Sequence, residues 1–290
     1  MPAPAVAVPN VSEGRDPRGV ELLAAAVTGE GARVVDVHSD PIHNRSVLTS
    51  AGPVEVLVPA MAELAAAAAV IDLTQHSGVH PRLGGLDVCP FVVGEAGVEA
   101  AVGAARAAGA AIAERAGVPV YLYGFAATRP ECERLPDIRA GGLQRLTQRS
   151  ESELPPDFGA VPIDPHRGVV CVGARDVLIA LNVVVRADPA TAKSLAAAVR
   201  CDESLSGVRA LGLDLGGGTA QVSMNLTDPA LTGVDDAFSA VAAVAETAGV
   251  RVVGTELVGV PPERFMPDPD AQAARLLIQP GRSLEAALAG

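Results

Sequence analysis

The sequence lacks tryptophan altogether, and aromatic residues make up only 2% of its 290 positions. A core built around large aromatic side chains is therefore excluded. Hydrophobic residues nevertheless reach 49% of the chain, with alanine, valine and leucine in abundance. Small and branched aliphatic side chains must fill the interior, and the length suffices for one large domain or two of ordinary size.

Basic residues are also scarce, and a single lysine, Lys193, occurs among the 22 basic side chains. Against 34 acidic residues they leave a formal net charge of −12. A nucleic-acid-binding protein needs a basic face that displaces counterions, so this class is excluded. An anionic metabolite can still bind, because a local group of arginines overrides the global charge at short range.

Cysteine is rare, and its pattern contains no C-x-x-C pair. The four residues are Cys89, Cys132, Cys171 and Cys201. Their scatter predicts free thiols in a reducing compartment, and it argues against a disulfide framework or a zinc knuckle.

The sequence shows neither a signal peptide nor a membrane span. The N-terminal segment MPAPAVAVPNVSEGR lacks the basic start and apolar centre of a secretory signal. The most apolar long run, residues 54–73, is interrupted by Glu55, Pro59 and Glu63. We therefore expect a cytoplasmic protein.

Short runs rich in valine alternate with alanine-rich stretches of helical period. The runs predicted as strands are residues 5–10, 32–39, 45–50, 118–124, 176–185 and 250–259. The stretches predicted as helices are residues 18–28, 54–71, 98–116, 190–199 and 234–248. Gly117 and Gly249 follow two of these helices as C-terminal stops. Mixed elements of this kind predict an α/β or α+β fold, in which helices pack on a sheet.

One segment without helical period, residues 147–165, is rich in proline, serine and acidic side chains. We expect a long loop here, and loops of such length usually carry function or link domains. A second series of strand, helix, hairpin, helix and strand follows it. The sequence thus predicts two α/β subdomains, residues 1–177 and residues 178–290.

The glycine-rich segment LGLDLGGGT is similar to the phosphate loops of actin-like ATPases. Such an ATPase needs an earlier partner turn and a later adenosine motif, and the sequence has neither. A hairpin explains the pattern better, with strands over residues 208–215 and 219–226. Gly216, Gly217 and Gly218 would then adopt the positive φ of a tight turn. We expect no bound nucleotide.

The residues with most chemical potential lie in the segment 71–91, IDLTQHSGVHPRLGGLDVCPF. Proline disfavours α geometry in the residue before it, so His80 must lie on a loop between a helix and a strand. Beside Arg82 and chain-breaking residues, this histidine is a candidate for acid–base chemistry, with a purely structural histidine as the alternative. Asp72, His76 and His80 would form a metal face only on an unbroken helix, so we expect no metal.

Two further polar clusters lie near the N-terminus, NVSEGR from Asn10 and DVHSDPIHNR ending at Arg45. They bring amide donors from Asn10 and Asn44 and a guanidinium group from Arg45. Such groups suit bidentate recognition of carboxylates, although ordinary capping turns contain the same residue types.

The chain resembles the formiminotransferase family in a series of motifs: VPNVSEGR, HNRSVLT, IDLTQHSGVHPRLGGLDVCPF, VPVYLYG, LPDIRAG, PDFG, GARDVLIALNV, AQVSMNL and VVGTELVG. The resemblance spans residues 6–265. Its most specific element is the block H-x-G-x-H-P-R-x-G-x-x-D-V-C-P-F. In animals this domain is fused to a cyclodeaminase, and the present chain resembles the monofunctional transferase.

The resemblance implies two ferredoxin-like α/β subdomains, each a β-sheet with helices packed on one face, with a folate cleft between them. It also implies a homodimer. The implied reaction belongs to histidine degradation and one-carbon metabolism. It transfers the formimino group from N-formimidoyl-L-glutamate to N5 of tetrahydrofolate and releases L-glutamate. Tetrahydrofolate would be a co-substrate, and neither a metal nor a nucleotide would take part.

The catalytic histidine of the family corresponds to His80. The attacking nitrogen must lose a proton and the departing glutamate nitrogen must gain one, and a neutral imidazole can serve both steps. Binding both substrates together would supply much of the rate through orientation. The family's folate-binding loop corresponds to Gly159, Ala160, Val161, Pro162, Ile163, Asp164, Pro165, His166, Arg167 and Gly168.

The carboxylates of formimidoylglutamate or of the folate tail need cationic partners. Arg45, Arg82 and Arg139 are the candidates, and Asn10 and Asn44 are polar candidates of the same kind. Any of the three arginines could instead form a structural ion pair.

Three residues depart from the family pattern. His38 stands where some relatives have aspartate, Val11 where they have phenylalanine, and Gly142 where a glutamate is common. These departures leave open a related folate-dependent transferase that uses N-formylglutamate or acts on 5-formyltetrahydrofolate. A non-catalytic folate-binding protein is the alternative from another functional class.

Overall fold

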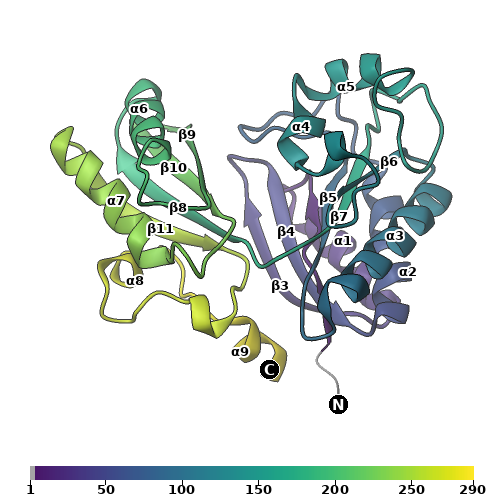
Figure 1. Ribbon diagram of the computed structural model, residues 1–290, viewed down its shortest axis with the longest axis horizontal. Coiled ribbons are helices and arrows are strands. Elements are labelled where there is room, and N and C mark those ends of the chain that lie inside the picture. The colour runs from purple at the N-terminus through teal and green to yellow at the C-terminus, as the bar shows by residue number, and fades with distance from the viewer. Residues whose placement is uncertain (1–3) are drawn as a thin grey trace. The chain divides into compact units, whose positions relative to one another are not determined.

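The structure is a computed structural model that describes residues 4–290. The chain forms two compact units, Met1–Arg175 and Asp176–Gly290. Each unit has its own sheet and its own hydrophobic core (Figure 1). Among the described residues, no helix combines the length and the apolar character needed to cross a membrane.

The first unit begins with a β-α-β-β-α-β arrangement. Its elements are β1 (Ala5–Ala7), β2 (Asn10–Val11), α1 (Pro17–Gly29), β3 (Arg33–Asp40), β4 (Arg45–Gly52), α2 (Val54–Ala68) and β5 (Leu86–Val92). β1 and β2 act as one interrupted strand, because both pair antiparallel with β4 on one side and with β5 on the other. β3 pairs with the outer side of β4.

Beyond β5 the sheet of the first unit continues with parallel strands. β7 (Val170–Arg175) pairs with β5, and β6 (Val120–Gly124) pairs with β7. Parallel strands need crossovers, and α3 (Gly97–Ala116) connects β5 to β6 before ending at the left-handed Gly117. Between β6 and β7 the chain forms η1 (Pro130–Cys132), α4 (Leu135–Arg139) and α5 (Gly142–Ser150).

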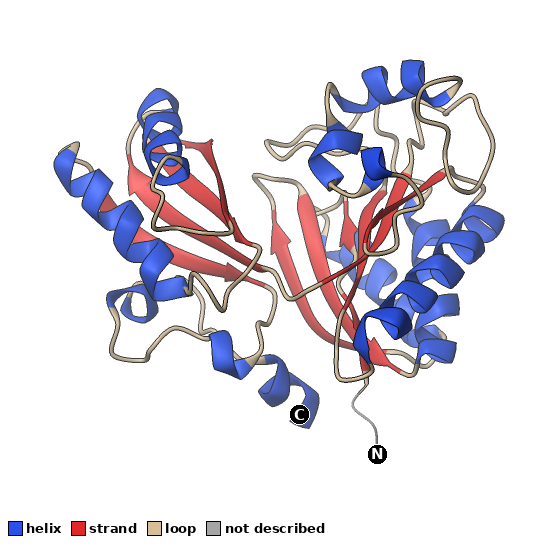
Figure 2. Cartoon of the chain, in the orientation of Figure 1, coloured by secondary structure: helices blue, strands red, loops and turns tan. Residues whose placement is uncertain are grey.

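Helices α1, α2 and α3 cover one face of this sheet (Figure 2). Alanine dominates where α2 and α3 pack, and Ala60, Ala104 and Ala108 are buried there. Larger side chains such as Leu48 and Met61 are fully buried in the same core. Burial of one side chain of that size stabilises the fold by about 1.5–3 kcal/mol, so an aliphatic core suffices without tryptophan.

Helices α4 and α5 pack on the opposite face of β5, β7 and β6. Ile138 from α4 and Leu146 from α5 form a cluster with Val88, Tyr121 and Cys171 from the three strands. The family resemblance implied helices packed on one face, which α1, α2 and α3 provide, and the first unit adds α4 and α5 on the other face. Its physical reason is that parallel strands are buried on both sides and need cover on both.

The prediction of a loop over residues 147–165 was wrong at its beginning. Residues 147–150 belong to α5, and irregular structure starts after Ser150. This helix buries Leu146 and Ser150 and exposes Gln144, Arg145 and Gln148. With nine residues and two leucines, Leu143 and Leu146, it is shorter than the five predicted helices, which are confirmed to within a few residues.

The second unit repeats the β-α-β-β-α-β order. Its elements are β8 (Ile179–Arg186), α6 (Pro189–Arg200), β9 (Val208–Gly216), β10 (Thr219–Leu226), α7 (Val234–Thr247) and β11 (Arg251–Val258). The strands are antiparallel in the order β11-β8-β10-β9, the ferredoxin-like arrangement. Val183 and Met224 from the sheet pack with Leu195 from α6 and Phe238 from α7. The chain ends with η2 (Glu263–Phe265), α8 (Gln272–Arg275) and α9 (Leu284–Ala289).

The glycine run is the turn of the hairpin β9–β10, as predicted. Gly216, Gly217 and Gly218 have φ values of 79°, 60° and 72°, a region that side chains with a Cβ atom avoid. The Asp214 carboxylate accepts a hydrogen bond from the amide of Gly216 and closes the turn. Local turn chemistry thus explains the motif.

Candidate functional site

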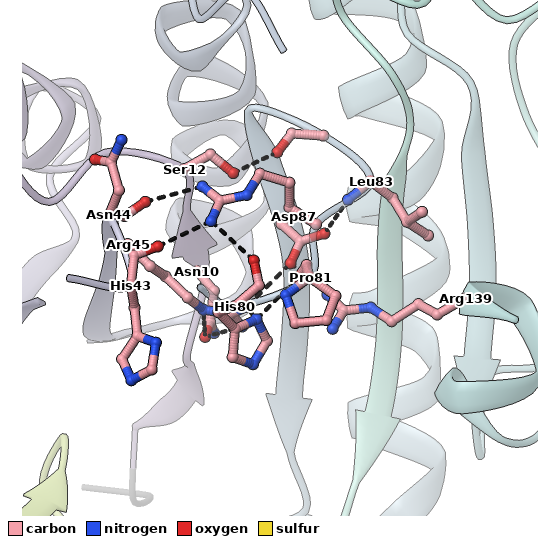
Figure 3. A network of polar contacts seen from close by, with 12 residues as sticks. Asn10, Ser12, His43, Asn44, Arg45, His80, Pro81, Leu83, Asp87 and Arg139 are labelled. Carbon is pink, nitrogen blue, oxygen red and sulfur yellow. Dashed lines mark hydrogen bonds and ion pairs between the residues drawn. The ribbon is translucent and has the colours of Figure 1, made fainter. Parts of the chain in front are cut away.

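His80 lies on the long connection between α2 and β5, as the His-Pro dipeptide predicted. Residues 69–85 contain no helix, and the His80 side chain is half-buried. Its ring is surrounded by polar groups from β2, β4, β5 and α4 (Figure 3). His43 meets it edge to face, with 6.1 Å between the ring centroids and 88° between the planes. The most distinctive histidine of the sequence is therefore the centre of a polar network.

The Nδ1 atom of His80 has two neighbours that require opposite tautomers. Nη1 of Arg45 lies 2.7 Å from it and can only donate, whereas the carbonyl oxygen of Pro81 lies 2.7 Å from it and can only accept. When Nδ1 carries the proton and donates to Pro81, the lone pair of the neutral ring is on Nε2. That tautomer is the one that can accept a proton from a substrate.

The surroundings of His80 favour its neutral form. Burial is the largest cause that lowers its pKa, followed by the positive charges of Arg45 and Arg139, while Asp87 opposes them. The net effect holds the pKa of His80 well below its ordinary value. At neutral pH the ring is uncharged and available as a base.

Arg45 is held by three groups. Its Nε and Nη2 atoms donate to the Asn10 side-chain oxygen, and Nη1 reaches the Asp87 carboxylate at 3.2 Å as well as His80. Burial lowers the pKa of Arg45 to about 10, with Asp87 opposing and Arg139 adding to the effect. It remains a cation at neutral pH, and most of its donors are already used.

Arg82 binds the main chain around the site. Nη2 donates to the carbonyl oxygens of His43 and His80 at 2.8 Å each, and Nη1 donates to the carbonyl of Asn44 at 3.0 Å. Nη1 also lies 2.7 Å from Nδ1 of His76. Arg82 therefore connects the loop that carries His80 to the turn between β3 and β4.

Asn10 and Asn44 are also close to the network. Asn10 donates to the Val8 carbonyl and accepts from Arg45. Asn44 has a positive φ of 49°; its side-chain oxygen accepts from the Gly14 amide and its nitrogen donates to the Ser77 carbonyl. Both amides are thus engaged within the protein.

Asp87 was not among the predicted site residues. Its side chain is 1% exposed, and it joins three parts of the first unit: Oδ1 accepts from the Leu83 amide at 2.8 Å, and Oδ2 accepts from Arg45 and Arg139. Burial alone would raise the pKa of Asp87, but Arg139 and Arg45 outweigh it and lower that pKa. A sequence signal existed, namely a single acid in the apolar strand LDVCPF.

Arg139 completes the cluster from the end of α4. Nη2 donates to Asp87, while Nε is buried and has no hydrogen-bond partner within residues 4–290. Three guanidinium groups against one carboxylate leave two net positive charges around the neutral His80. In a chain with a net charge of −12 this is a local cationic centre, as bidentate carboxylate recognition requires.

The predicted folate loop, residues 159–168, lies against the loop of His80. Gly84 and Gly168 form a β-bridge, the Val169 amide donates to the Leu83 carbonyl at 2.9 Å, and the Leu73 amide donates to the His166 carbonyl at 2.9 Å. Most of the loop is exposed. Ile163 and Gly168 are buried and attach it to the unit. Two segments far apart in sequence are thereby adjacent.

The three departures from the family pattern occupy different environments. Val11 is fully buried in the core, His38 is on the outer strand β3 opposite Val47, and Gly142 begins α5 with a φ of 71°. None of the three has a hydrogen bond to His80 within the described chain.

A pocket of about 520 Å³ lies beside the network and includes Asn44 and His76 in its lining. Glu13, Asp16 and Asp72 line it as well. Three carboxylates against the one guanidinium group of Arg15 disfavour a dicarboxylate ligand in this pocket. Within residues 4–290 no group of three or more His, Cys, Asp or Glu side chains could hold a metal ion.

Comparison with known proteins gives one family for the whole chain. Residues 5–175 match the model of the "Formiminotransferase domain, N-terminal subdomain", and residues 180–279 match the "Formiminotransferase domain". The glutamate formimidoyltransferase of Thermoplasma acidophilum is 38% identical over 270 residues, covering 90% of this chain and 89% of that protein. The protein of the same name from Streptococcus pyogenes is 34% identical over 268 residues, covering 90% of each chain.

Longer relatives match as well. The formimidoyltransferase-cyclodeaminase of Sus scrofa is 37% identical over 273 residues, which is 90% of this chain and 50% of that protein. The chain thus spans about half the length of several curated relatives it matches. Two matching family models and two relatives of similar length lead to one conclusion. The chain belongs to the formiminotransferase family.

Proposed function

We propose that this protein is a glutamate formimidoyltransferase, which transfers the formimino group from N-formimidoyl-L-glutamate to N5 of tetrahydrofolate and releases L-glutamate. The observation that carries the proposal is a half-buried, neutral histidine inside a cationic cluster, next to an exposed loop. The names of the relatives of similar length agree with it.

His80 handles the proton in this proposal. With Nδ1–H donated to the Pro81 carbonyl, Nε2 takes the proton that the attacking nitrogen must lose, and the ring then returns it to the departing glutamate nitrogen. The low pKa of His80 keeps the ring unprotonated before the reaction and makes the charged ring a ready proton donor to the departing nitrogen, at the cost of a lower affinity for the proton that it first takes. The nearby cations Arg45 and Arg139 add to that tendency.

Tetrahydrofolate supplies the accepting nitrogen when it is bound. The loop from Gly159 to Gly168 is suited to bind this co-substrate, because its exposed residues offer backbone amides and carbonyls beside the His80 loop. Contacts from Leu73 and Val169 attach its C-terminal half. We propose that Gly159, Ala160, Val161, Pro162, Ile163, Asp164, Pro165, His166, Arg167 and Gly168 hold the folate.

Among the three arginines, Arg139 is the best candidate to bind a carboxylate of the donor. Arg45 uses Nε and Nη2 on Asn10 and Nη1 on Asp87, and Arg82 uses both terminal nitrogens on main-chain carbonyls. Arg139 uses Nη2 on Asp87, and its Nη1 has no hydrogen-bond partner within residues 4–290. The other arginines, with Asn10 and Asn44, would then shape the site.

The test compares the wild type with His80→Ala, using tetrahydrofolate and N-formimidoyl-L-glutamate. On acidification the product cyclises to methenyltetrahydrofolate, which is detected by its near-ultraviolet absorbance. We expect the variant to lose about 100- to 10,000-fold in kcat while folate still binds. N-Formylglutamate and 5-formyltetrahydrofolate serve as alternative substrates. Turnover with one of these alone identifies the related transferase, and folate binding without any turnover identifies a folate-binding protein.

We further propose that the protein acts as a cytoplasmic homodimer, without a metal or a nucleotide. Light scattering during size-exclusion chromatography tests the dimer. Dialysis against a chelator tests the metal, and the expected result is unchanged activity. Calorimetric titration of ATP with magnesium tests the nucleotide, and no heat of binding is expected because the glycine run is a hairpin turn.

A further inference from the structure

The Asp87 carboxylate has a geometry that a regular strand would not give it. Asn10 on β2 pairs with Val88, while the next residue, Val11, pairs with Leu86. Asp87 is therefore the extra residue of a β-bulge. Bulges re-aim a side chain out of the normal alternation and are common next to active sites.

From the bulge the carboxylate reaches the groups that surround His80. One oxygen accepts from the Leu83 amide, three residues after His80, and so fixes the loop. The other accepts from Arg45, whose Nη1 lies against the His80 ring, and from Arg139 (Figure 3). Without this carboxylate the two guanidinium groups would repel each other inside the protein.

We infer that Asp87 is a positioning residue of the formimidoyltransferase site: from its bulge it holds Arg45 and Arg139 around His80 and fixes the loop that carries the histidine. It does not touch the reacting atoms. Arg45 lies against the Nδ1 side of the ring, and Arg139, whose Nη2 is used on Asp87, keeps Nη1 for a substrate carboxylate. This role deepens the proposed function and rests on it.

Several charged and titratable groups act on the His80 ring. Arg45 and Arg139 favour its neutral form, and Asp87 favours its charged form. His43 faces the ring edge, and Arg82 binds the carbonyl of His80. Asp87 therefore has two opposite effects on the proton affinity of His80. Its own charge raises that affinity, and the arginines that it holds in place lower it more.

This opposition gives a test that needs no substrate. His80 is titrated by NMR in ¹³C-histidine-labelled protein, and its signal is identified by its absence from the spectrum of His80→Ala. If Asp87 positions the arginines, Asp87→Asn releases them and the titration midpoint of His80 rises toward its ordinary value. A midpoint that falls shows that Asp87 acts through its own charge alone. That result, or an unchanged midpoint, would overturn the inference.

Two further variants secure the result. Asp87→Glu keeps the negative charge and a partner for both arginines but lengthens the side chain. It therefore tests the position of the carboxylate if Asp87→Asn does not fold. The His80 midpoint should also rise in this variant. Asp157→Asn is the matched control, since Asp157 is a buried carboxylate that accepts from the Leu122 amide and pairs with Arg129. It should leave the His80 midpoint unchanged, and a rise in this control would refute the assignment.

The kinetic measurement separates this inference from the proposed function. In a wild type that catalyses transfer, Asp87→Asn should lower kcat by about 100-fold, because a displacement of about 1 Å at a catalytic group has that effect. The KM for tetrahydrofolate should change little. If the wild type shows no transfer but the His80 midpoint still rises in Asp87→Asn, the proposed function fails and the positioning by Asp87 stands.

Discussion

The close approach between the His80 loop and residues 159–168 requires a glycine at position 168. Gly168 has a φ of 67°, and a Cβ atom built on it would overlap the carbonyl oxygen of Leu83 and lie 2.6 Å from Cδ1 of Leu73. The next residue, Val169, donates a backbone hydrogen bond to the same Leu83 carbonyl. Gly168→Ala must therefore separate the two loops.

The expected loss of stability has three parts. A residue with a Cβ atom at this φ costs about 1–2 kcal/mol, forced overpacking costs about 1–3 kcal/mol, and a lost hydrogen bond costs about 1 kcal/mol. Together they give roughly 3–6 kcal/mol, which lowers Tm by about 6–24 °C for a unit of this size. Gly142→Ala is the matched control in the same unit, because Gly142 has a φ of 71° and open space around it. It should lose only the first part, about 1–2 kcal/mol.

Circular dichroism melting of both variants measures this difference, and steady-state kinetics measures its effect on folate. Gly168→Ala should raise the KM for tetrahydrofolate, because the proposed folate loop is displaced from its attachment. Gly142→Ala should leave this KM unchanged. If Gly168→Ala melts no lower than Gly142→Ala, the two loops are not in tight contact and the reasoning is refuted.

Three more predictions concern the core and the charges. Leu57 is fully buried while Val70 is 86% exposed, so Leu57→Ala should cost about 2–5 kcal/mol in chemical unfolding and Val70→Ala almost nothing. Arg82→Lys should lower Tm, because one ammonium cannot reach the His43, Asn44 and His80 carbonyls together, and exposed Arg18→Lys is its control. The folded-state pKa of His80 lies below its unfolded-state value. The contribution of His80 to stability is therefore complete above about pH 6.5 and is lost as the pH falls toward the folded-state pKa. In His80→Ala the slope of the unfolding free energy against pH should decrease. The acidic limb of kcat/KM should likewise lie below the ordinary histidine pKa.

Much of the fold could be predicted from the sequence because its signals are local. Gly117 ends α3 in a left-handed conformation, and the glycines after Leu215 form the turn of a hairpin. Helix α5 was not among the predicted helices, because it is short and its two leucines, Leu143 and Leu146, pack on strands far away in the sequence. The cover of the second sheet face is a property of the assembled sheet, which no local pattern records.

The site could be located from sequence but its internal roles could not. His80 was identified because the following proline forces a loop, which is a local effect. Asp87 was missed because a bulge between β2 and β5 turns its side chain, and the sequence of one strand does not reveal a register shift with another. An isolated acid in an apolar strand was the available signal.

The three arginines show most clearly why the folded structure is needed. As residue types they are equivalent candidates for a carboxylate, and the sequence gives no means to rank them. In the folded protein Arg82 binds main-chain carbonyls. Every residue has such a carbonyl, so the sequence cannot indicate which ones an arginine will bind. An arginine can bind a substrate carboxylate only with N–H groups that the folded protein does not already use. By that criterion we propose Arg139 for ligand recognition, since one of its terminal nitrogens is used on Asp87 and the other has no hydrogen-bond partner among the described residues. Its substitution, Arg139→Gln, should therefore raise the KM for the donor, whereas Arg82→Lys should act mainly on stability.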